Sequence, residues 1–150
     1  MTKNKRKIPD DDHVIRYVPW SRLRRDGNDE VIGILGEAFH LREKDKGRLS
    51  ATWLEYFSND CDTQLTKAVR VIRTGSLNVK SKSGFAIGNI RKIQATCMKY
   101  KSKIRIVHSP SRDNNAHVSV IGLPEDNSEL FELLASEAWA DLVLNKDIPD

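Results

Sequence analysis

The sequence lacks any long apolar run. No stretch of its 150 residues approaches the roughly 18 consecutive apolar residues that a membrane-spanning helix needs. The opening residues, MTKNKRKIPDDD, are followed by no apolar segment, so we expect no secretory signal. Apolar residues make up 39% of the chain and charged residues 31%, a mix typical of a globular domain with a strongly charged surface. We therefore predict a cytoplasmic protein without membrane contact.

Cysteine is also scarce. Cys61 and Cys97 stand far apart and form no CxxC pair, which excludes a zinc site built on paired thiolates. The histidines show no HxH or HxxxH spacing either, so a metal site made by His40, His108 and His117 is not expected. The sequence predicts neither a metal nor another cofactor.

Acidic residues are absent from one whole third of the chain. Residues 1–62 hold 12 Lys/Arg and 12 Asp/Glu, whereas residues 63–112 hold 12 Lys/Arg and no acid. Residues 113–150 then hold nine acids and a single lysine, Lys146. This separation of a basic block from an acidic block is the strongest non-random feature of the sequence, and it bears on the choice of partner.

The apolar periodicity predicts one domain of the α+β class. Residues 1–12 are almost wholly polar, and we predict that they form a flexible tail ahead of a domain over residues 13–150. Alternating or branched apolar residues predict strands at 13–20, 30–41, 48–57, 85–90, 103–109 and 117–123. Apolar residues at helical spacing predict helices at 61–73, 89–101 and 126–144. This order favours a largely antiparallel sheet packed with two or three helices.

The last of these helices is predicted from its start signal and its stripe. Asp126 and Glu129 have the spacing of a capping box, directly after Pro124. The apolar stripe that follows consists of Leu130, Leu134, Ala138 and Leu142. The pattern predicts one long, deeply packed helix.

Two histidines are the candidates for catalysis. The strands at 103–109 and 117–123 have the spacing of a hairpin, which would bring His108 and His117 together at its loop end. Two imidazoles placed there can share acid–base work or bind an anion. His117 and Ser119 form one H-x-S motif of the kind that 2H phosphoesterases carry in pairs, but Pro110 breaks the second copy after His108. The alternative is that both are strand-end histidines hydrogen-bonded to the polar loop.

The basic block is the other candidate site. A surface of this charge attracts phosphate backbones with salt-sensitive affinity. The predicted nucleic-acid or phosphate contacts are Arg70, Arg73, Lys80, Lys82, Arg91, Lys92, Lys99, Lys101 and Lys103. Two alternatives stay open: the acidic C-terminal helix neutralises the block within one chain or across a homodimer, or the block binds an acidic protein partner.

The segments EAFHLREKDKGRLSATWLEYF (37–57) and NNAHVSVIGLP (114–124) resemble a set of short bacterial proteins of unknown function. The resemblance covers most of 13–148 and implies a bacterial or phage-related, cytoplasmic origin and an independent domain. It draws attention to His117 and to Leu49–Ser50 without giving either a role.

Three functions follow as hypotheses. The first is an accessory module that contacts nucleic acid or another phosphate-rich partner through the basic block, within a multi-protein system. The second is a small phosphate-directed enzyme, such as a nuclease, phosphoesterase or transferase, that uses His108 and His117. The third is a homodimeric or antitoxin-like partner of another protein. The sequence leaves open whether the protein is an enzyme.

Overall fold

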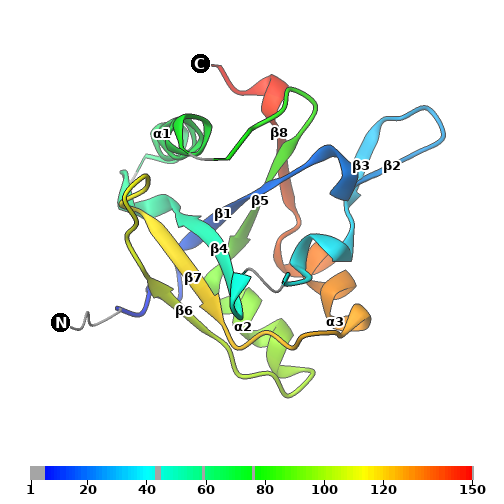
Figure 1. Ribbon diagram of the computed structural model, residues 1–150, viewed down its shortest axis with the longest axis vertical. Helices are drawn as coiled ribbons and strands as arrows, with labels where there is room; N and C mark the ends of the chain where they lie inside the picture. Colours follow the sequence, from blue (N-terminus) through cyan, green and yellow to red (C-terminus); the bar gives the residue numbers. More distant parts are fainter. Residues whose placement is uncertain (1–5, 43–44, 59, 76, 150) are drawn as a thin grey trace.

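The computed structural model describes residues 6–42, 45–58, 60–75 and 77–149, the side chain of Cys61 excepted. Six strands form the main sheet in the order β6-β7-β4-β1-β5-β8, and each neighbouring pair is antiparallel (Figure 1). These strands are β1 His13–Val18, β4 Arg48–Trp53, β5 Gly84–Asn89, β6 Arg105–His108, β7 His117–Ile121 and β8 Asp141–Leu144. A separate hairpin of β2 Leu23–Arg25 and β3 Val31–Ile34 stands to one side of the sheet.

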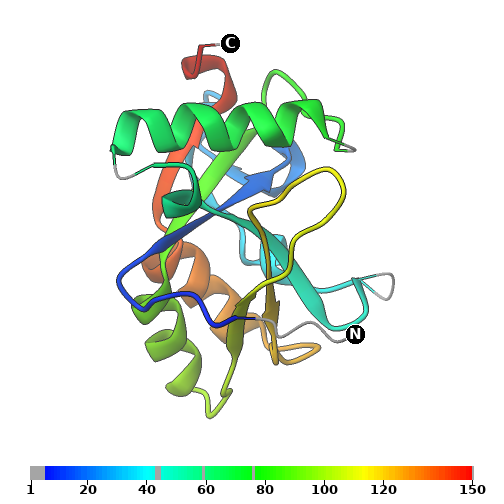
Figure 2. The same ribbon diagram turned by 90° about the vertical axis from the view of Figure 1, so that its left-hand side faces the viewer.

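Helices cover both faces of the sheet. Figure 2 shows α1 (Cys61–Thr74) across one face, while α2 (Ile90–Met98) and α3 (Ser128–Leu133) lie on the other. The face under α1 buries Ile15 and Phe85, and the opposite face holds the larger apolar core around Trp139. The predicted α+β class with a largely antiparallel sheet is confirmed. None of the helices in the described part of the chain has the length and apolarity to cross a membrane.

Local side-chain contacts explain where the helices begin. The Asn89 side chain accepts a hydrogen bond from the Lys92 amide at 3.1 Å, and Asn127 caps α3 in the same way through the Leu130 amide. Each contact satisfies one of the amide groups that a first helical turn leaves without a partner. Asn127 therefore takes the capping role that the sequence assigned to Asp126.

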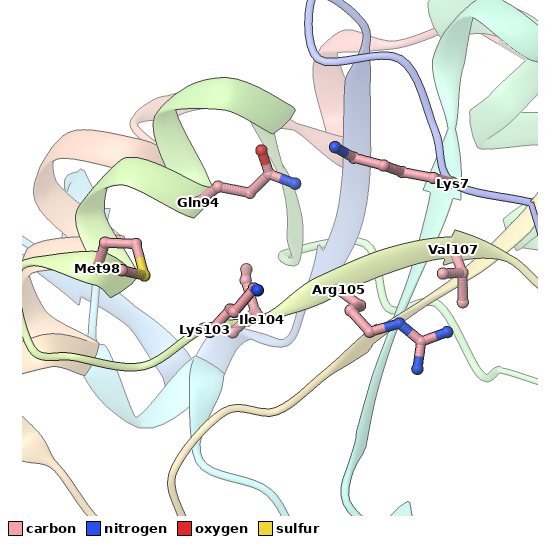
Figure 3. Close-up of a pocket in the computed structure, with 7 residues that line it drawn as sticks. All are labelled: Lys7, Gln94, Met98, Lys103, Ile104, Arg105 and Val107. Atoms are coloured by element: carbon pink, nitrogen blue, oxygen red, sulfur yellow. The ribbon is translucent and has the colours of Figure 1, made fainter.

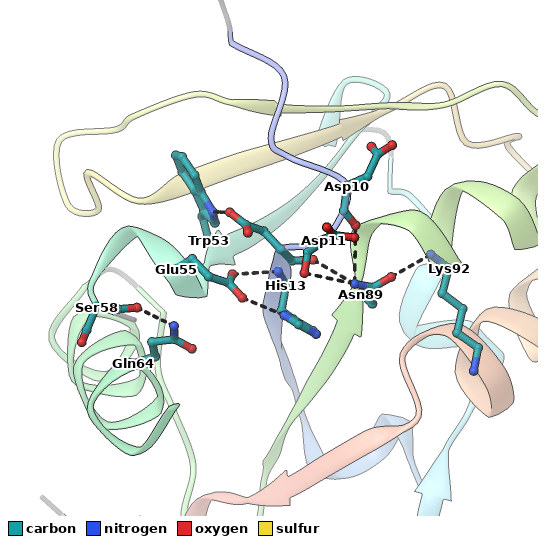
Figure 4. A network of polar contacts seen from close by, with 10 residues as sticks. Asp10, Asp11, His13, Trp53, Glu55, Ser58, Gln64, Asn89 and Lys92 are labelled. Atoms are coloured by element: carbon teal, nitrogen blue, oxygen red, sulfur yellow. Dashed lines mark hydrogen bonds and ion pairs between the residues drawn. The ribbon is translucent and has the colours of Figure 1, made fainter. Parts of the chain in front are cut away.

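Residues 6–12 pack against the sheet, although the sequence predicted a tail through residue 12. Ile8 is fully buried, and its amide donates to the Ile106 carbonyl at 3.2 Å. Further along, the carbonyls of Asp10 and Asp12 accept from the first amides of α2. The Asn89 side chain also donates to this segment (Figure 4). From Arg6 onward this segment is part of the packed domain, because the buried Ile8 side chain and the backbone hydrogen bonds of the segment hold it against the sheet. Residues 1–5 of the predicted tail lie outside the described residues.

The predicted helix over 126–144 is wrong in its second half. α3 ends at Leu133, a π-helical turn runs over Leu134–Ala138, and the chain then becomes β8. Trp139 ends the helical part, and its buried ring lies 5.6 Å from that of Phe39, centroid to centroid. The strand follows because β5 offers a free edge, with Gly84 opposite Leu144.

The strand predicted at 30–41 is also too long. Only Val31–Ile34 pairs as a strand, and Gly36–Phe39 forms a 3-10 turn. Gly36 lies so close to α3 that an added Cβ would be 2.8 Å from the Glu132 amide nitrogen. This close approach holds the turn over the sheet and forms one wall of the groove described below.

The sheet opens between its two central strands. β1 and β4 pair only at Val14 with Trp53 and at Ile15 with Thr52, although each strand has six residues. Beyond Ile15, β1 stays with β5 and β4 stays with β7, so the two halves diverge (Figure 1). The opening leaves strand edges in the middle of the molecule, and the candidate site forms there.

Candidate functional site

A groove of about 930 Å³ occupies the opening between β1 and β4, and we call it the split groove. Its lining comes from both halves of the sheet, from α1, from the 3-10 turn and from α3. Five arginines and five carboxylates of the described residues line it: Arg16, Arg22, Arg42, Arg48, Arg112, Glu37, Asp45, Asp113, Asp126 and Glu132. Because the two signs balance, the groove suits a small ligand with one anionic group better than a long polyanion.

Arg16 lies across the opening. Its Nη1 donates to the Ser50 carbonyl of β4 at 2.6 Å, and Nε and Nη2 donate to the Ala38 carbonyl at 3.4 and 3.3 Å. The guanidinium thus satisfies the Ser50 carbonyl, which a continuous sheet would pair with β1, and also ties β1 to the 3-10 turn through Ala38. Since a guanidinium carries five N–H groups, one hydrogen on each terminal nitrogen remains for a ligand.

The charge of Arg16 has no close counter-ion among the described residues. Burial lowers the pKa of Arg16 to about 10; Asp45 opposes this shift and Arg42 adds to it, and the group stays charged at neutral pH. Burial would raise the pKa of Asp45, but hydrogen bonds from Arg42 and the charges of both arginines lower it. Asp45 pairs with Arg42 at 3.3 Å rather than with Arg16. A half-buried cation in this state favours an anionic ligand.

His117 lines the same groove from β7, on the side of the sheet that faces α1. Its Nδ1 lies 2.9 Å from the Ser109 carbonyl and 2.9 Å from the Ser109 hydroxyl, which in turn contacts the buried Ser119 hydroxyl at 2.8 Å. A carbonyl only accepts, so Nδ1 carries the hydrogen and Nε2 keeps its lone pair. No group of the described chain hydrogen-bonds Nε2, which leaves it available to a ligand.

The surroundings of His117 favour the neutral ring. Burial lowers the pKa of His117 below its usual value, the hydrogen bond to the Ser109 backbone opposes that shift, and the charge of His108 adds to it. A neutral imidazole with an open Nε2 can accept a proton at neutral pH. Next to it, Thr52 is buried and accepts a hydrogen bond from Asn114 at 2.9 Å, so the floor of the groove is fixed.

His108 lies in a different environment. The predicted hairpin forms, but its register pairs His108 with Val118 and therefore turns the two imidazoles to opposite faces of the sheet. The His108 ring packs against Trp53 and Tyr56, and its Nε2 contacts the Asn115 carbonyl at 2.7 Å. His108 does not line the split groove. The structure thus brings His117, without His108, to the candidate site.

No family model, no curated protein and no solved structure matches this chain.

The residues of the basic block are divided between the two faces of the sheet. Arg70 and Arg73 belong to α1, whereas Arg91 and Lys92 belong to α2 on the opposite face (Figure 2). Lys99, Lys101 and Lys103 follow α2 toward β6, and Lys80 and Lys82 precede β5. One flat polyanion therefore cannot touch all of them at once.

Several members of the block already have contacts within the protein. Arg73 donates to Asn145 and to the Ile148 and Pro149 carbonyls, which ties α1 to the C-terminal residues. Arg91 pairs with Asp11 at 2.7 Å, and the Lys82 ammonium lies 5.3 Å from the Trp20 ring centroid. In the described residues, the acidic segment 113–149 meets the block at one ion pair, Lys99 with Glu137 at 3.6 Å.

Cys97 is a buried free thiol, and burial raises its pKa to about 11, which makes it a poor nucleophile. Within the described ranges, no three His, Cys, Asp or Glu side chains gather closely enough to hold a metal ion.

The sequence analysis did not select Arg16, although the sequence carries a signal for it. Arg16 lies at period two between Val14 and Val18, and both valines are fully buried.

Proposed function

We propose that the protein is a small phosphate-directed enzyme whose active site is the split groove. One observation carries the proposal: Arg16, which has no ion-pair partner among the described residues, lines the same groove as His117, whose Nε2 makes no hydrogen bond within the described residues. Arginine is the side chain best suited to hold two phosphate oxygens at once. The groove volume of about 930 Å³ is large enough for a nucleotide-sized ligand.

The two residues have separate roles in this proposal. Arg16 binds one phosphate group through its two remaining N–H groups and offsets the charge that builds up on the phosphoryl oxygens. His117 is the general base: Nε2 takes a proton from water or from a ligand hydroxyl, and that oxygen bonds to phosphorus. The phosphate ester bond then breaks, and the leaving oxygen receives the proton from the imidazolium. Ser109 positions His117 by holding its Nδ1 hydrogen.

Binding is tested first, with inorganic phosphate and with nucleoside mono- and diphosphates in isothermal titration calorimetry. We expect Arg16→Gln to weaken phosphate binding by about 10- to 100-fold, because the substitution removes a pair of charge-assisted hydrogen bonds. Arg16→Lys keeps the positive charge but not the paired N–H groups of the guanidinium, so its phosphate affinity should lie between those of the wild type and Arg16→Gln. The matched control is Arg105→Gln, which removes a cation from β6 outside the groove.

Turnover is tested by phosphorus NMR on a panel of phosphate mono- and diesters. His117→Gln should bind as the wild-type protein does and lose turnover. If Arg16→Gln binds phosphate as well as Arg105→Gln does, the anion site is not at Arg16. If no ester is cleaved although phosphate binds at Arg16, the groove is a binding site only.

Contact with nucleic acid through the basic block stays a prediction beside this proposal. The balanced charge of the split groove gives no support to a polyanion there, so such contact would use the outer faces of α1 or α2.

A further inference from the structure

A second groove, of about 380 Å³, lies between α2 and the outer side of β6, and we call it the edge groove (Figure 3). It is lined by Lys7, Gln94, Met98, Lys103, Ile104, Arg105 and Val107. β6 is an edge strand of the main sheet; residues 6–8 pair with part of its outer side, and the backbone of Ile104, directly before β6, stays open to pairing. The edge groove lies on the face of the sheet opposite α1 and shares no residue with the split groove.

The protein's own N-terminal segment shows how a chain can bind along this edge. Lys7 bridges to Val107 in antiparallel register, with the Ile8 amide donating to the Ile106 carbonyl and the His108 amide donating to the Arg6 carbonyl. The segment leaves the edge after Ile8, because Pro9 follows. By strand alternation, the amide and carbonyl of Ile104 also point away from β7, and no backbone group of the described chain pairs with them.

The side chains at the open part of the edge combine an apolar floor with a cationic rim. Ile104 forms the floor, and Met98 from α2 is 54% exposed beside it. Lys103 and Arg105 are exposed, and neither has an ion-pair partner among the described residues. None of the lining residues is acidic. The surface thus offers unpaired backbone, apolar contact and uncompensated positive charge together.

We propose that the edge groove binds an acidic, extended segment of a partner protein by strand addition to β6. The partner strand pairs with the backbone at Ile104, places apolar side chains against Met98 and Ile104, and sets carboxylates against Lys103 and Arg105. A second copy of this protein is disfavoured, because pairing β6 with itself would bring the same cations together. A nucleic-acid strand is disfavoured, because the lining has no aromatic ring on which a base could stack.

The probe is a short capped peptide that alternates glutamate with valine, carries fluorescein and is titrated with the full-length protein in an anisotropy assay. Three comparisons define the site. The double variant Lys103→Glu/Arg105→Glu should weaken peptide binding by at least about tenfold. The charge-matched control Lys67→Glu/Arg70→Glu, on exposed positions of α1, should not. The same peptide N-methylated at alternate amides keeps its charge and side chains but cannot pair as a strand, so it should lose binding.

Each other outcome overturns the proposal. Equal binding of the N-methylated peptide would mean that the groove takes no strand. Equal weakening by both double variants would mean that only net charge matters. Absence of peptide binding would mean that the edge groove takes no acidic strand. Tighter binding of an oligonucleotide at Lys103 and Arg105 would assign the groove to nucleic acid. A dimer in analytical ultracentrifugation that these two substitutions dissociate would assign it to a second copy of the protein. Phosphate binding at Arg16 is measured separately, so this result does not depend on the proposed enzyme function.

Discussion

The sheet stops pairing between β1 and β4 and at the outer side of β6, and the protein closes these two gaps with different chemistry. In the interior, between β1 and β4, Arg16 crosses the gap and donates to the Ser50 and Ala38 carbonyls. At the outer edge of β6, the gap is closed by a short piece of chain, with Ile8 as its buried anchor. A cation therefore seals the interior gap, and an apolar side chain with backbone pairing seals the outer one.

The difference matters because the two closures leave different hydrogen-bonding groups without a partner. A guanidinium that has satisfied two carbonyls still carries N–H groups and a positive charge, so the split groove selects a small anion. The N-terminal segment pairs with Ile106 and His108, and the unused groups beyond it are the amide and carbonyl of Ile104, directly before β6. That edge selects an extended chain. The following predictions test whether the two gaps really behave as separate sites.

The largest effect is expected at the apolar seal. Ile8→Ala removes a fully buried side chain and should lower the free energy of unfolding by about 2–5 kcal/mol. Ile32→Ala is the matched control, because Ile32 on β3 is 61% exposed and its truncation should change stability by no more than about 0.5 kcal/mol. Urea denaturation followed by tryptophan fluorescence measures both. Equal, small effects would show that residues 6–12 are a detachable tail, as their composition suggests.

The next effect separates the two sites by their ligands. Phosphate at a hundred times its wild-type dissociation constant should stabilise the wild-type fold by about 2.7 kcal/mol. At the same concentration the 10- to 100-fold weaker binding of Arg16→Gln leaves about 1.4 to 0.4 kcal/mol. The acidic peptide should stabilise Arg16→Gln as much as the wild type, and should lose its effect in Lys103→Glu/Arg105→Glu. Thermal unfolding with each ligand measures all four cases. If one variant removed both responses, the grooves would be coupled rather than separate.

The fold class and most elements follow from local pattern, and the failures share one cause. Strands β1, β4, β6 and β7 lie within the predicted ranges because their branched residues alternate over several positions. β8 was missed because its strand character comes from pairing with β5, a contact between distant parts of the chain. The helical stripe of α3 extends by chance through Leu142, so local periodicity favoured the wrong structure.

The site was predictable only in part, for a similar reason. Residue type and a polar turn singled out His117, which lines the split groove, but the hairpin register decides which histidine lies on that side of the sheet, and no local signal gives that register. Arg16 carried a readable signal, a lone cation on the buried side of an apolar strand. The split that gives Arg16 its role depends on where β1 and β4 separate, which the sequence of neither strand reveals.

The state of His117 makes a smaller and directional prediction. Because burial lowers its pKa in the folded protein, the unfolded chain binds the proton more readily. The stability that neutral His117 contributes is therefore present above the unfolded pKa of about 6.5 and is lost as the pH falls from there toward the lowered folded value. Nitrogen-15 NMR of the imidazole should show hydrogen on Nδ1 at neutral pH and protonation below pH about 6.5. Hydrogen on Nε2 would remove His117 as the general base.

The smallest effect is expected for nucleic acid, because its contacts would be exposed charges on opposite faces. Fluorescence anisotropy with labelled single-stranded and duplex DNA and RNA, over a salt series, gives a slope of about −0.9 for each duplex phosphate contact. One flat polyanion cannot touch α1 and α2 together. We therefore expect one double variant to reduce the salt slope by about two contacts, either Lys67→Glu/Arg70→Glu or Lys92→Glu/Lys101→Glu. The other pair should leave it unchanged. Equal reduction by both would mean that the nucleic acid wraps around the domain, and absence of binding at low salt would leave the basic block without a polyanionic partner.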